Sequence, residues 1–271
     1  MPDTQALVND FLNKLKKRKI EGSQATAKQT AELLRSVISQ TRMPYTNQAA
    51  ALIHSVKAVG ERLIAANPVG SSRTVLEFLC AAKEKKRSFR VFVAEGAPRY
   101  QGHLLAKELV TRGLQTTLIT DSAVFALISR VNMVIVGAHA VMANGGVIAP
   151  VGLNMVALAA QKHAVPFVVL AGSHKLCPLY PHHPEVLLNE LRSPSELLDF
   201  GEFSDCLDFG SGIGAPLLHV VNPTFDYVPP KLVSLFITDT GGHNPSYMYR
   251  LIADYYSADD LVLERRTTSG N

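Results

Sequence analysis

Two acidic residues follow apolar segments that are typical of buried β-strands. Glu95 lies at the end of VFVAEG, and Asp121 comes directly after TTLIT. In parallel sheets the carboxyl ends of the strands carry the ligand site, and two carboxylates there can act as general acid and base. Asp121 also suits a helix N-cap position. The spacing therefore leaves an acid–base role and a capping role open.

The segment VGAHAVMANGG, residues 136–146, has the composition of a buried strand that runs into a turn of small residues. Its polar side chains are His139 and Asn144, and it contains no nucleophile or carboxylate. The histidines of the chain show no HExxH or other ligand spacing, and the cysteines show no CxxC spacing. The sequence therefore predicts no metal site and no bound cofactor.

Two glycine-containing segments could receive a phosphate group. In GSSRT, residues 70–74, backbone N–H groups at a helix start could hold an anion beside Arg73. Ser71 or Ser72 could equally be ordinary helix N-caps. In GSGIG, residues 210–214, no apolar strand comes before the glycines, so an exposed loop is favoured over a dinucleotide site. The absence of a GxxxxGK[ST] motif excludes P-loop chemistry.

Short apolar segments rich in β-branched residues are expected to position these groups. They alternate with amphipathic segments, a pattern that predicts a Rossmann-like α/β domain over residues 69–271, with a parallel sheet covered on both faces. A helix over 73–86 should open this domain, with Thr74 and Glu77 as a capping box. The predicted strands are 89–96, 116–120, 132–138 and 166–172, and the other predicted helices are 102–111, 122–130, 151–163 and 245–256.

Residues 1–68 have the pattern of a helical region. Apolar residues recur every three or four positions in segments 8–15, 33–38 and 52–63. This region holds ten Lys and Arg against five Asp and Glu, whereas residues 69–271 hold seventeen against eighteen. The basic run Lys16, Lys17 and Arg18 therefore indicates either an acidic partner or a solvated helix face.

The composition of the 271 residues, 47% hydrophobic and 18% charged, is that of a folded chain. No apolar run approaches the roughly 18–20 residues that span a bilayer, and the first residues do not resemble a secretory signal. Three widely spaced cysteines favour a reducing compartment. We therefore expect the protein in the cytosol.

Three longer segments carry a resemblance to a known family: VAEGAPRYQGHLLAKEL, TTLITDSAVFALISRVNMVIVGAHAVMANGGV and NPTFDYVPPKLVSLFITDTGGHNPSYMYRLI. They resemble the regulatory subunits of eukaryotic translation initiation factor 2B. Aldose–ketose isomerases of methylthioribose 1-phosphate and ribose 1,5-bisphosphate belong to the same superfamily. The resemblance covers about residues 70–265 and extends more weakly into the first helices. FDYVPP and GGHNPSYMYRL are most similar to the beta type of subunit.

The resemblance implies that the isomerase site is lost. The related isomerases are expected to pair a catalytic Cys with an Asp, but here the Cys loop is NPVGSSR and the Asp position holds His139. The phosphate-binding turn ETRP has become EGAP, with Ala97 in place of the Arg. Groups for proton transfer and for phosphate binding are both needed in such a reaction. The resemblance implies that a remnant of the isomerase ligand cleft persists. It assigns seven residues to this vestigial cleft: Ser71, Ser72, Arg73, Glu95, Asn144, Asn222 and Asp226.

The function implied by the resemblance is that of a non-catalytic regulatory subunit in a guanine-nucleotide exchange complex, in which the epsilon subunit catalyses exchange. The implied partners are the alpha, gamma, delta and epsilon subunits in a decamer, and the alpha subunit of initiation factor 2, whose phosphorylated form would face the basic run. No contact with nucleic acid or membrane is implied. A sugar-phosphate isomerase with a rearranged site and a phosphate-binding sensor remain as alternatives.

Two further expectations concern assembly and the sheet. Seven residues are expected at subunit interfaces: Phe225, Tyr227, Pro230, Asn244, Tyr247, Tyr249 and Arg250. The alternative is that their aromatic side chains fill the core of this chain. After VGERLIAANP, residues 59–68, the family continues with more helices and a strand, whereas here Arg73 follows at once. A truncated helical region and a sheet that lacks one strand are therefore expected.

Overall fold

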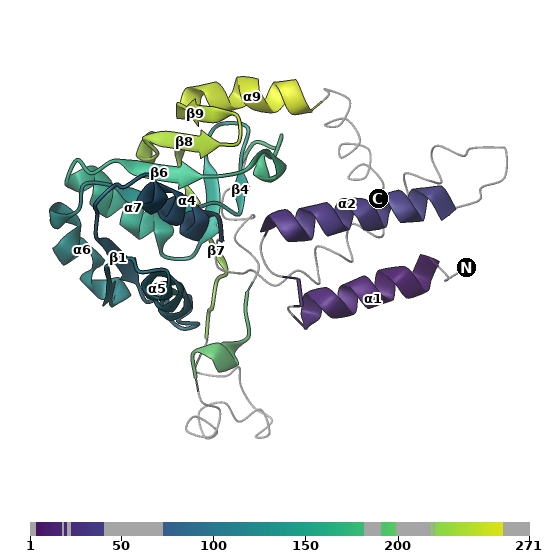
Figure 1. The fold of residues 1–271 in the computed structure, drawn as a ribbon, viewed down its shortest axis with the longest axis horizontal. Helices are drawn as coiled ribbons and strands as arrows, with labels where there is room; N and C mark the ends of the chain where they lie inside the picture. Colours follow the sequence, from purple (N-terminus) through teal and green to yellow (C-terminus); the bar gives the residue numbers. More distant parts are fainter. Residues whose placement is uncertain are drawn as a thin grey trace. The chain divides into compact units, whose positions relative to one another are not determined.

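The computed structural model describes residues 4–17, 19–20, 23–40, 73–181, 191–198, 218 and 220–256. The chain divides into two compact units, Met1–Arg73 and Thr74–Asn271, which are considered separately below (Figure 1). The predicted helix over 52–63 and the loop GSGIG lie outside the described residues. Among the described helices, none has the length and apolar character that crossing a bilayer requires.

The first unit contains the helices α1 (Thr4–Lys16) and α2 (Ser23–Gln40). Both form because apolar residues recur at helical spacing along one side. Val8, Phe11 and Leu15 of α1 are buried in a common cluster with Leu33 and Val37 of α2. The predicted helical stripes in these two segments are therefore confirmed, and they form the core between the two helices.

The larger sheet of the second unit has the strand order β3–β6–β8–β9. The strands β3 (Val134–Gly137), β6 (Phe167–Leu170) and β8 (Leu235–Thr238) are parallel, and β9 (Gly241–His243) pairs antiparallel with β8. All four residues of β6 are buried, because their side chains alternate between two apolar clusters. The predicted parallel α/β sheet is confirmed here.

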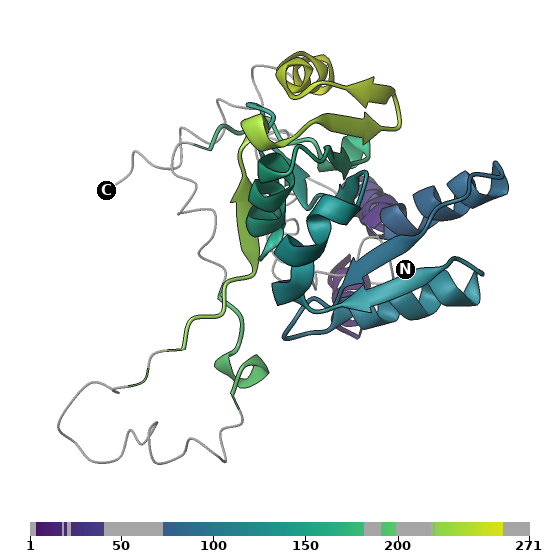
Figure 2. The same ribbon diagram turned by 90° about the vertical axis from the view of Figure 1, so that its left-hand side faces the viewer.

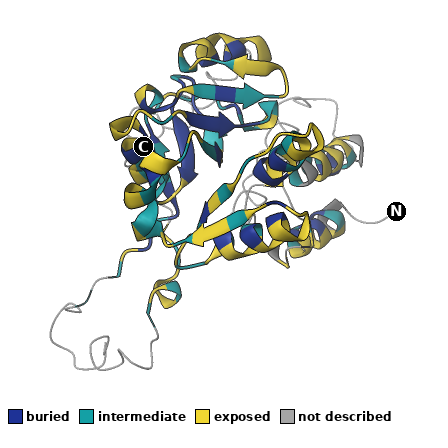
Figure 3. Ribbon diagram, turned by 60° about the vertical axis from the view of Figure 1, so that its left-hand side comes forward, coloured by how far each residue is buried: buried dark blue, intermediate teal, exposed yellow. Residues whose placement is uncertain are grey.

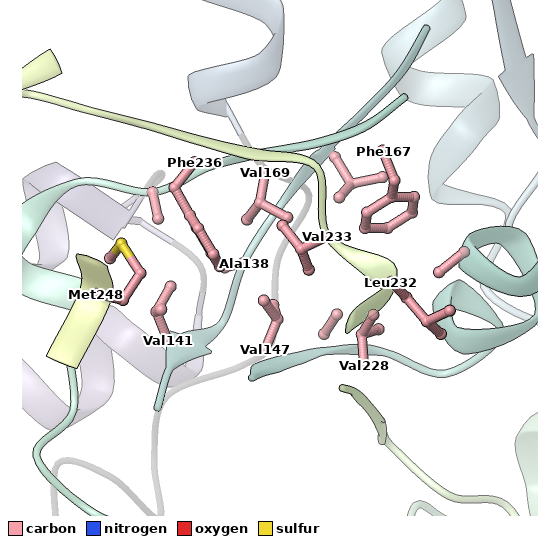
Figure 4. Packing of buried hydrophobic residues seen from close by; sticks show 14 of the residues in the cluster. Ala138, Val141, Val147, Phe167, Val169, Val228, Leu232, Val233, Phe236 and Met248 are labelled. Carbon is pink, nitrogen blue, oxygen red and sulfur yellow. The ribbon is translucent and has the colours of Figure 1, made fainter. Parts of the chain in front are cut away.

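One face of β6 belongs to the main core. Phe167 and Val169 pack there with residues of β8, of α7 (Leu153–Lys162) and of α9 (Met248–Tyr255). A three-stranded antiparallel sheet with the order β4–β5–β7 completes this core, and Figure 4 shows its Val147 and Val228 facing the same cluster as Phe236. Its strands are β4 (Ala140–Val141), β5 (Val147–Pro150) and β7 (Phe225–Val228).

The other face of β6 belongs to a second cluster. Val168 and Leu170 pack there with apolar residues of α4 (Arg73–Glu84), β1 (Val91–Ala94) and α5 (Gln101–Thr111). The strand β1 pairs in parallel with β2 (Thr116–Ile119), and this pair forms a separate two-stranded sheet (Figure 2). The second unit therefore contains two parallel sheets that share a helix layer.

Within the described residues, the parallel strands fall into two separate sheets, and the expected loss of one strand stays a prediction because residues 41–72 lie outside them. A doubly wound sheet has the order 3-2-1-4-5-6. The separate orders β2–β1 and β3–β6–β8 match the parts of this order on either side of its strand 1. Among the described residues, no strand pairs with the second edge of β1 or of β3.

Several local predictions differ from the structure. The predicted helix over 122–130 is a short α6 (Val124–Leu127) between the 3₁₀ turns η1 (Asp121–Ala123) and η2 (Ile128–Arg130). The helix α4 begins at Arg73, so Thr74 lies within its first turn, and Glu77 pairs with Arg112 at 3.2 Å. The predicted capping box is therefore wrong, because the tertiary ion pair takes the carboxylate that the cap would need.

Candidate functional site

The loop after β1 carries the first acidic residue of the predicted site. The backbone of Glu95 is fixed at both ends, because its N–H donates to the Ile119 carbonyl and its carbonyl accepts from Gly102, each at 2.9 Å. A Cβ atom on Gly102 would lie 1.8 Å from the Ala94 carbonyl oxygen, so only glycine lets α5 start this close to β1. The Glu95 side chain is half-buried, with His103 Nε2 at 4.0 Å.

Asp121 holds the same loop from the neighbouring strand. Its two carboxylate oxygens accept hydrogen bonds from the N–H groups of Gly96 (2.9 Å) and Ala97 (2.8 Å). The N-cap of η1 is Thr120, which makes no side-chain capping bond, so Asp121 does not take the N-cap position that was one of its two possible roles. Asp121 joins the carboxyl ends of β1 and β2, with both oxygens engaged.

The corner that follows β3 holds a ring stack and a lysine. The exposed His139 lies against Phe225, with ring centroids 4.5 Å apart. The ammonium group of Lys175 donates to the Ala138 carbonyl at 2.5 Å, and burial lowers the pKa of Lys175. Sequence reasoning missed Lys175, because its contact joins residues 37 positions apart.

Asn144 lies in the tight turn between β4 and β5. Its Nδ2 donates to the Tyr227 hydroxyl at 2.7 Å, and its Oδ1 accepts from the Gly146 N–H at 2.9 Å. A Cβ atom on Gly146 would lie 2.3 Å from the Tyr227 hydroxyl oxygen, so the turn and the ring fit closely together. The Asn144 side-chain amide therefore joins the turn between β4 and β5 to β7 through its hydrogen bond to Tyr227.

Asp226 caps a helix from a neighbouring strand. It lies on β7 opposite Ala149, and its Oδ2 accepts from the N–H groups of Gly152 (2.7 Å) and Asn154 (3.1 Å). These N–H groups belong to the start of α7, where helices lack internal partners. Gly152 has φ 95°, a left-handed conformation that favours glycine. The carboxylate therefore also compensates the positive end of the helix.

Asn222 is buried beside the segment 191–198. Its Nδ2 donates to the Ser193 carbonyl at 3.1 Å, and its own carbonyl accepts from the Arg192 N–H at 2.7 Å. These bonds hold two distant segments together as a short antiparallel ribbon. The amide group of Asn222, like that of Asn144, is occupied in tertiary structure.

The residues of the predicted cleft are thus not brought together by direct contacts. No hydrogen bond or ion pair between described residues joins any two of Glu95, Asn144, Asn222 and Asp226. Arg73 is exposed at the start of α4, and Ser71 and Ser72 lie outside the described residues. The described positions contain no group of three His, Cys, Asp or Glu side chains that could hold a metal ion.

A second polar cluster, which sequence reasoning also missed, follows β6 and β8. The carboxylate of Asp239 accepts from the N–H and the hydroxyl of Ser173, both at 2.8 Å. Burial would raise the pKa of Asp239, but the bonds from Ser173 outweigh it and lower the pKa. Burial and the charge of Lys175 lower the pKa of His174. The cluster therefore connects the carboxyl ends of two strands, as Asp121 does elsewhere.

The predicted interface residues fall into two groups. Phe225 is buried and Tyr227 is half-buried, and both contact residues of the same chain, as described above. Pro230 is half-buried at the start of the 3₁₀ turn η6 (Pro230–Leu232). The exposed members are Asn244, Tyr247, Tyr249 and Arg250. In the basic run, Lys17 is exposed, whereas Arg18 and the Lys16 side chain lie outside the described residues.

Comparison with known proteins identifies the family of this chain. The model of the Initiation factor 2 subunit family matches residues 69–245. Translation initiation factor eIF2B subunit beta of Dictyostelium discoideum is 53% identical over 194 residues, which are 72% of this chain and 47% of that protein. The same subunit of Schizosaccharomyces pombe is 45% identical over 196 residues, again 72% and 47%. The chain thus spans about half the length of these relatives.

One enzyme and two solved structures are also similar to this chain. Ribose 1,5-bisphosphate isomerase of Archaeoglobus fulgidus is 33% identical over 188 residues, covering 68% of this chain and 55% of that protein. The translation initiation factor eIF-2B of Pyrococcus horikoshii has a TM-score of 0.67 at 22% identity, covering 90% of this chain and 98% of that one.

The tetrameric eIF2B-beta2-delta2 complex from Chaetomium thermophilum contains a chain with a TM-score of 0.61 at 21% identity, covering 94% of this chain and 96% of that one. The two solved structures support the same fold. The family model and the two beta subunits add the sequence evidence, and the chain belongs to the Initiation factor 2 subunit family.

Proposed function

We propose that this chain acts in the cytosol as a beta-type, non-catalytic regulatory subunit of the guanine-nucleotide exchange complex for translation initiation factor 2. The observation that carries the proposal is the 53% identity to a protein named as eIF2B subunit beta. The proposed partners are the alpha, gamma, delta and epsilon subunits in a decamer, together with the alpha subunit of initiation factor 2.

The geometry of the carboxyl edge supports a role without catalysis. An isomerase needs a group that transfers protons at the substrate and cations that hold its phosphate. The Asp226 oxygen cited above accepts from the start of α7, and both Asp121 oxygens accept from the loop after β1. These carboxylates stabilise the backbone at the sheet edge, which supports a structural role for them.

The exposed aromatic residues of the last helix support a role in assembly. Tyr249 is 59% exposed and lies beside Tyr180, with ring centroids 6.3 Å apart. Tyr247 is also exposed and stacks on His243 at 5.3 Å. Tyrosine and arginine are enriched at the centres of protein interfaces, so the exposed Tyr247, Tyr249 and Arg250 suit subunit contacts.

Co-purification with tagged delta and gamma subunits tests the proposal. We expect the unaltered chain to be retained, and Tyr249→Glu to reduce retention because it places a charge in the contact. Leu104→Glu is a matched control, because Leu104 on α5 is also 59% exposed. A chain that remained monomeric in the presence of both subunits would overturn the proposal. Equal retention of both variants would show that α9 is not part of the contact with the delta and gamma subunits.

The second candidate function is a sugar-phosphate isomerase, favoured by the 33% identity to ribose 1,5-bisphosphate isomerase. Glu95 is the carboxylate at the sheet edge that keeps its oxygens free of backbone bonds, and it would be the proton carrier. Turnover of ribose 1,5-bisphosphate or methylthioribose 1-phosphate that disappears in Glu95→Ala would establish this function. We expect no turnover by the unaltered chain.

A further inference from the structure

One serine of the chain precedes a proline, and it lies in an exposed segment. Of the 15 prolines in the sequence, Pro194 alone follows a serine or a threonine, namely Ser193. No residue of the segment 191–198 is buried, and Ser193, Pro194 and Ser195 are all exposed. A second protein can therefore reach the Ser193 hydroxyl group without unfolding the core.

The backbone of Ser193 is extended and held in place. Its φ of −55° and ψ of 132° are close to the polyproline II conformation, which a following proline favours. The Ser193 carbonyl accepts hydrogen bonds from the Asn222 amide (3.1 Å) and from the Glu196 N–H (3.2 Å). The Ser193 hydroxyl contacts the equally exposed Ser195 hydroxyl at 2.7 Å. The serine is thus presented on a fixed, extended backbone.

Two arginine side chains accompany this serine. Arg192 comes directly before it in the sequence, and Arg99 reaches the same segment from the loop after β1, with its Nε 3.4 Å from a Glu196 carboxylate oxygen. Burial lowers the pKa of Arg192, and the charge of Arg99 lowers it further, while Glu196 raises it. The two guanidinium groups are therefore close enough to repel each other. With one carboxylate between them, these three side chains carry a net charge of +1.

The charges of this cluster are incompletely matched. Charge-assisted N–H···O bonds are usually about 2.7–2.9 Å long, so the 3.4 Å contact between Arg99 and Glu196 is a weak one. The other Glu196 oxygen, Oε2, is buried and has no hydrogen-bond partner among the described residues. The Arg192 side chain makes no ion pair or hydrogen bond with a described residue. Both arginines are therefore available to a stronger anion.

We propose that Ser193 is a phosphorylation site and that Arg99 and Arg192 bind the phosphate group. The enzyme would be a proline-directed protein kinase, because Pro194 offers no backbone N–H to the kinase. In the reaction, Ser193 Oγ attacks the γ-phosphorus of ATP and the bond to the bridging oxygen breaks. ADP leaves, and the hydroxyl proton passes to a carboxylate base of the kinase. The proposal does not depend on the proposed regulatory function.

The phosphate would strengthen the attachment of segment 191–198 to the loop after β1. A phosphoserine carries a charge of about −1.5 to −2 at pH 7. Ser193 comes three positions before Glu196 at the 3₁₀ turn η4 (Pro194–Glu196), and side chains three apart lie on the same side of such a turn. The phosphate would thus repel Glu196 and attract Arg99. Arginine binds phosphate with two parallel hydrogen bonds, so Arg99 gains contacts in this exchange.

Phosphorylation of the full chain by a recombinant cyclin-dependent kinase with radiolabelled ATP tests the site. We expect the unaltered chain to be labelled and Ser193→Ala to lose the label. Ser195→Ala is the matched control and should keep it, because Ser195 is exposed but precedes Glu196 instead of a proline. Ser193→Thr retains the hydroxyl group and the proline, so its label should appear as phosphothreonine in place of phosphoserine. This last variant serves if Ser193→Ala does not fold.

A phosphorus NMR titration of the phosphorylated chain tests the role of the arginines. The second pKa of phosphoserine is ordinarily about 6, and two nearby cations favour the dianion. We therefore expect this pKa to be about half a unit lower in the unaltered chain than in Arg99→Gln with Arg192→Gln. Arg90→Gln with Arg130→Gln makes the same change in net charge at two exposed positions elsewhere and should leave the phosphate pKa unaltered.

Three results would overturn the proposal. The first is an unaltered chain that takes up no label. The second is equal labelling of Ser193→Ala and the unaltered chain, or phosphoserine in place of phosphothreonine in Ser193→Thr, since the kinase would then act elsewhere. The third is a phosphate pKa that is the same in the unaltered chain and in the Arg99 and Arg192 double variant, because the arginines would then not bind the phosphate.

Discussion

The two parallel sheets of the second unit differ in how completely they are covered. Every residue of β6 in the four-stranded sheet is buried, whereas β2 has no buried residue and β1 has one, Val93. Phe92 and Leu118 of the two-stranded sheet are 39% and 45% exposed (Figure 3). Parallel sheets are ordinarily buried on both faces. Among the described residues, the sheet is therefore well covered around β6 and poorly covered around β1.

The difference goes together with the edges of β1 and β3 that no described strand pairs with. In a doubly wound sheet, the first strand would separate β1 from β3 and cover one edge of each. Among the described residues, β1 and β2 are attached to the rest of the unit through the cluster of α4, α5 and β6. An isolated pair of strands is at best marginally stable. The cover of the β1–β2 sheet therefore depends on that single cluster.

The largest expected effect is a difference in the free energy of unfolding when a phenylalanine ring is removed from each of the two sheets. Phe236→Ala empties a fully buried position in β8, and we expect it to lower the free energy of unfolding by about 3–5 kcal/mol. Phe92→Ala in β1 removes a ring that is already partly in water, so the loss should be below about 1 kcal/mol. Urea unfolding followed by circular dichroism measures both. Similar losses would show that the β1–β2 sheet is as well packed as the larger one.

The hydrogen bond between Asn144 and Tyr227 should have the next largest effect. Tyr227→Phe leaves the half-buried Asn144 amide without its acceptor, and we expect a loss of about 1–3 kcal/mol in the free energy of unfolding. Tyr249→Phe is the matched control, because the Tyr249 ring is exposed. Thermal unfolding of the two variants side by side provides the comparison. If Tyr227→Phe left the stability unchanged, the hydrogen bond from Asn144 would not stabilise the turn between β4 and β5.

Lys86→Gly should stabilise the chain. Removal of the side chain relieves the left-handed strain, and we expect the free energy of unfolding to rise by about 1 kcal/mol. Lys85→Gly, one position earlier, removes the same charge without this relief and should not stabilise. Urea unfolding measures the gain. A loss of stability in Lys86→Gly would show that the lysine has a structural partner after all.

The smallest expected effect concerns the first unit. Replacement of Lys16, Lys17 and Arg18 by Glu should weaken binding of the phosphorylated alpha subunit of initiation factor 2 by up to about tenfold. Unphosphorylated substrate should be affected less, and the difference should shrink as salt rises. Surface plasmon resonance at two salt concentrations would measure this. Equal affinities of variant and unaltered chain at low salt would assign the basic run to a solvated helix face.

The parallel strands and their helices could be predicted from the sequence, because continuous apolar segments have only a few ways to be buried. The antiparallel sheet was not predictable in the same way: β4 has two residues, and β7 contains Asp226 at a position where a strand signal is weak. The role of Asp226 depends on α7, more than seventy residues away.

The central claim is that the polar residues of the predicted cleft hold the scaffold together instead of carrying out a reaction. Asp226→Ala tests it most directly, because the carboxylate caps α7 through two backbone bonds. We expect urea unfolding to show a loss of about 1–2 kcal/mol, the usual value of a helix cap. Asp254→Ala, at an exposed position of α9, should leave stability unchanged. Unaltered stability of Asp226→Ala, together with isomerase turnover that the substitution abolishes, would contradict the claim.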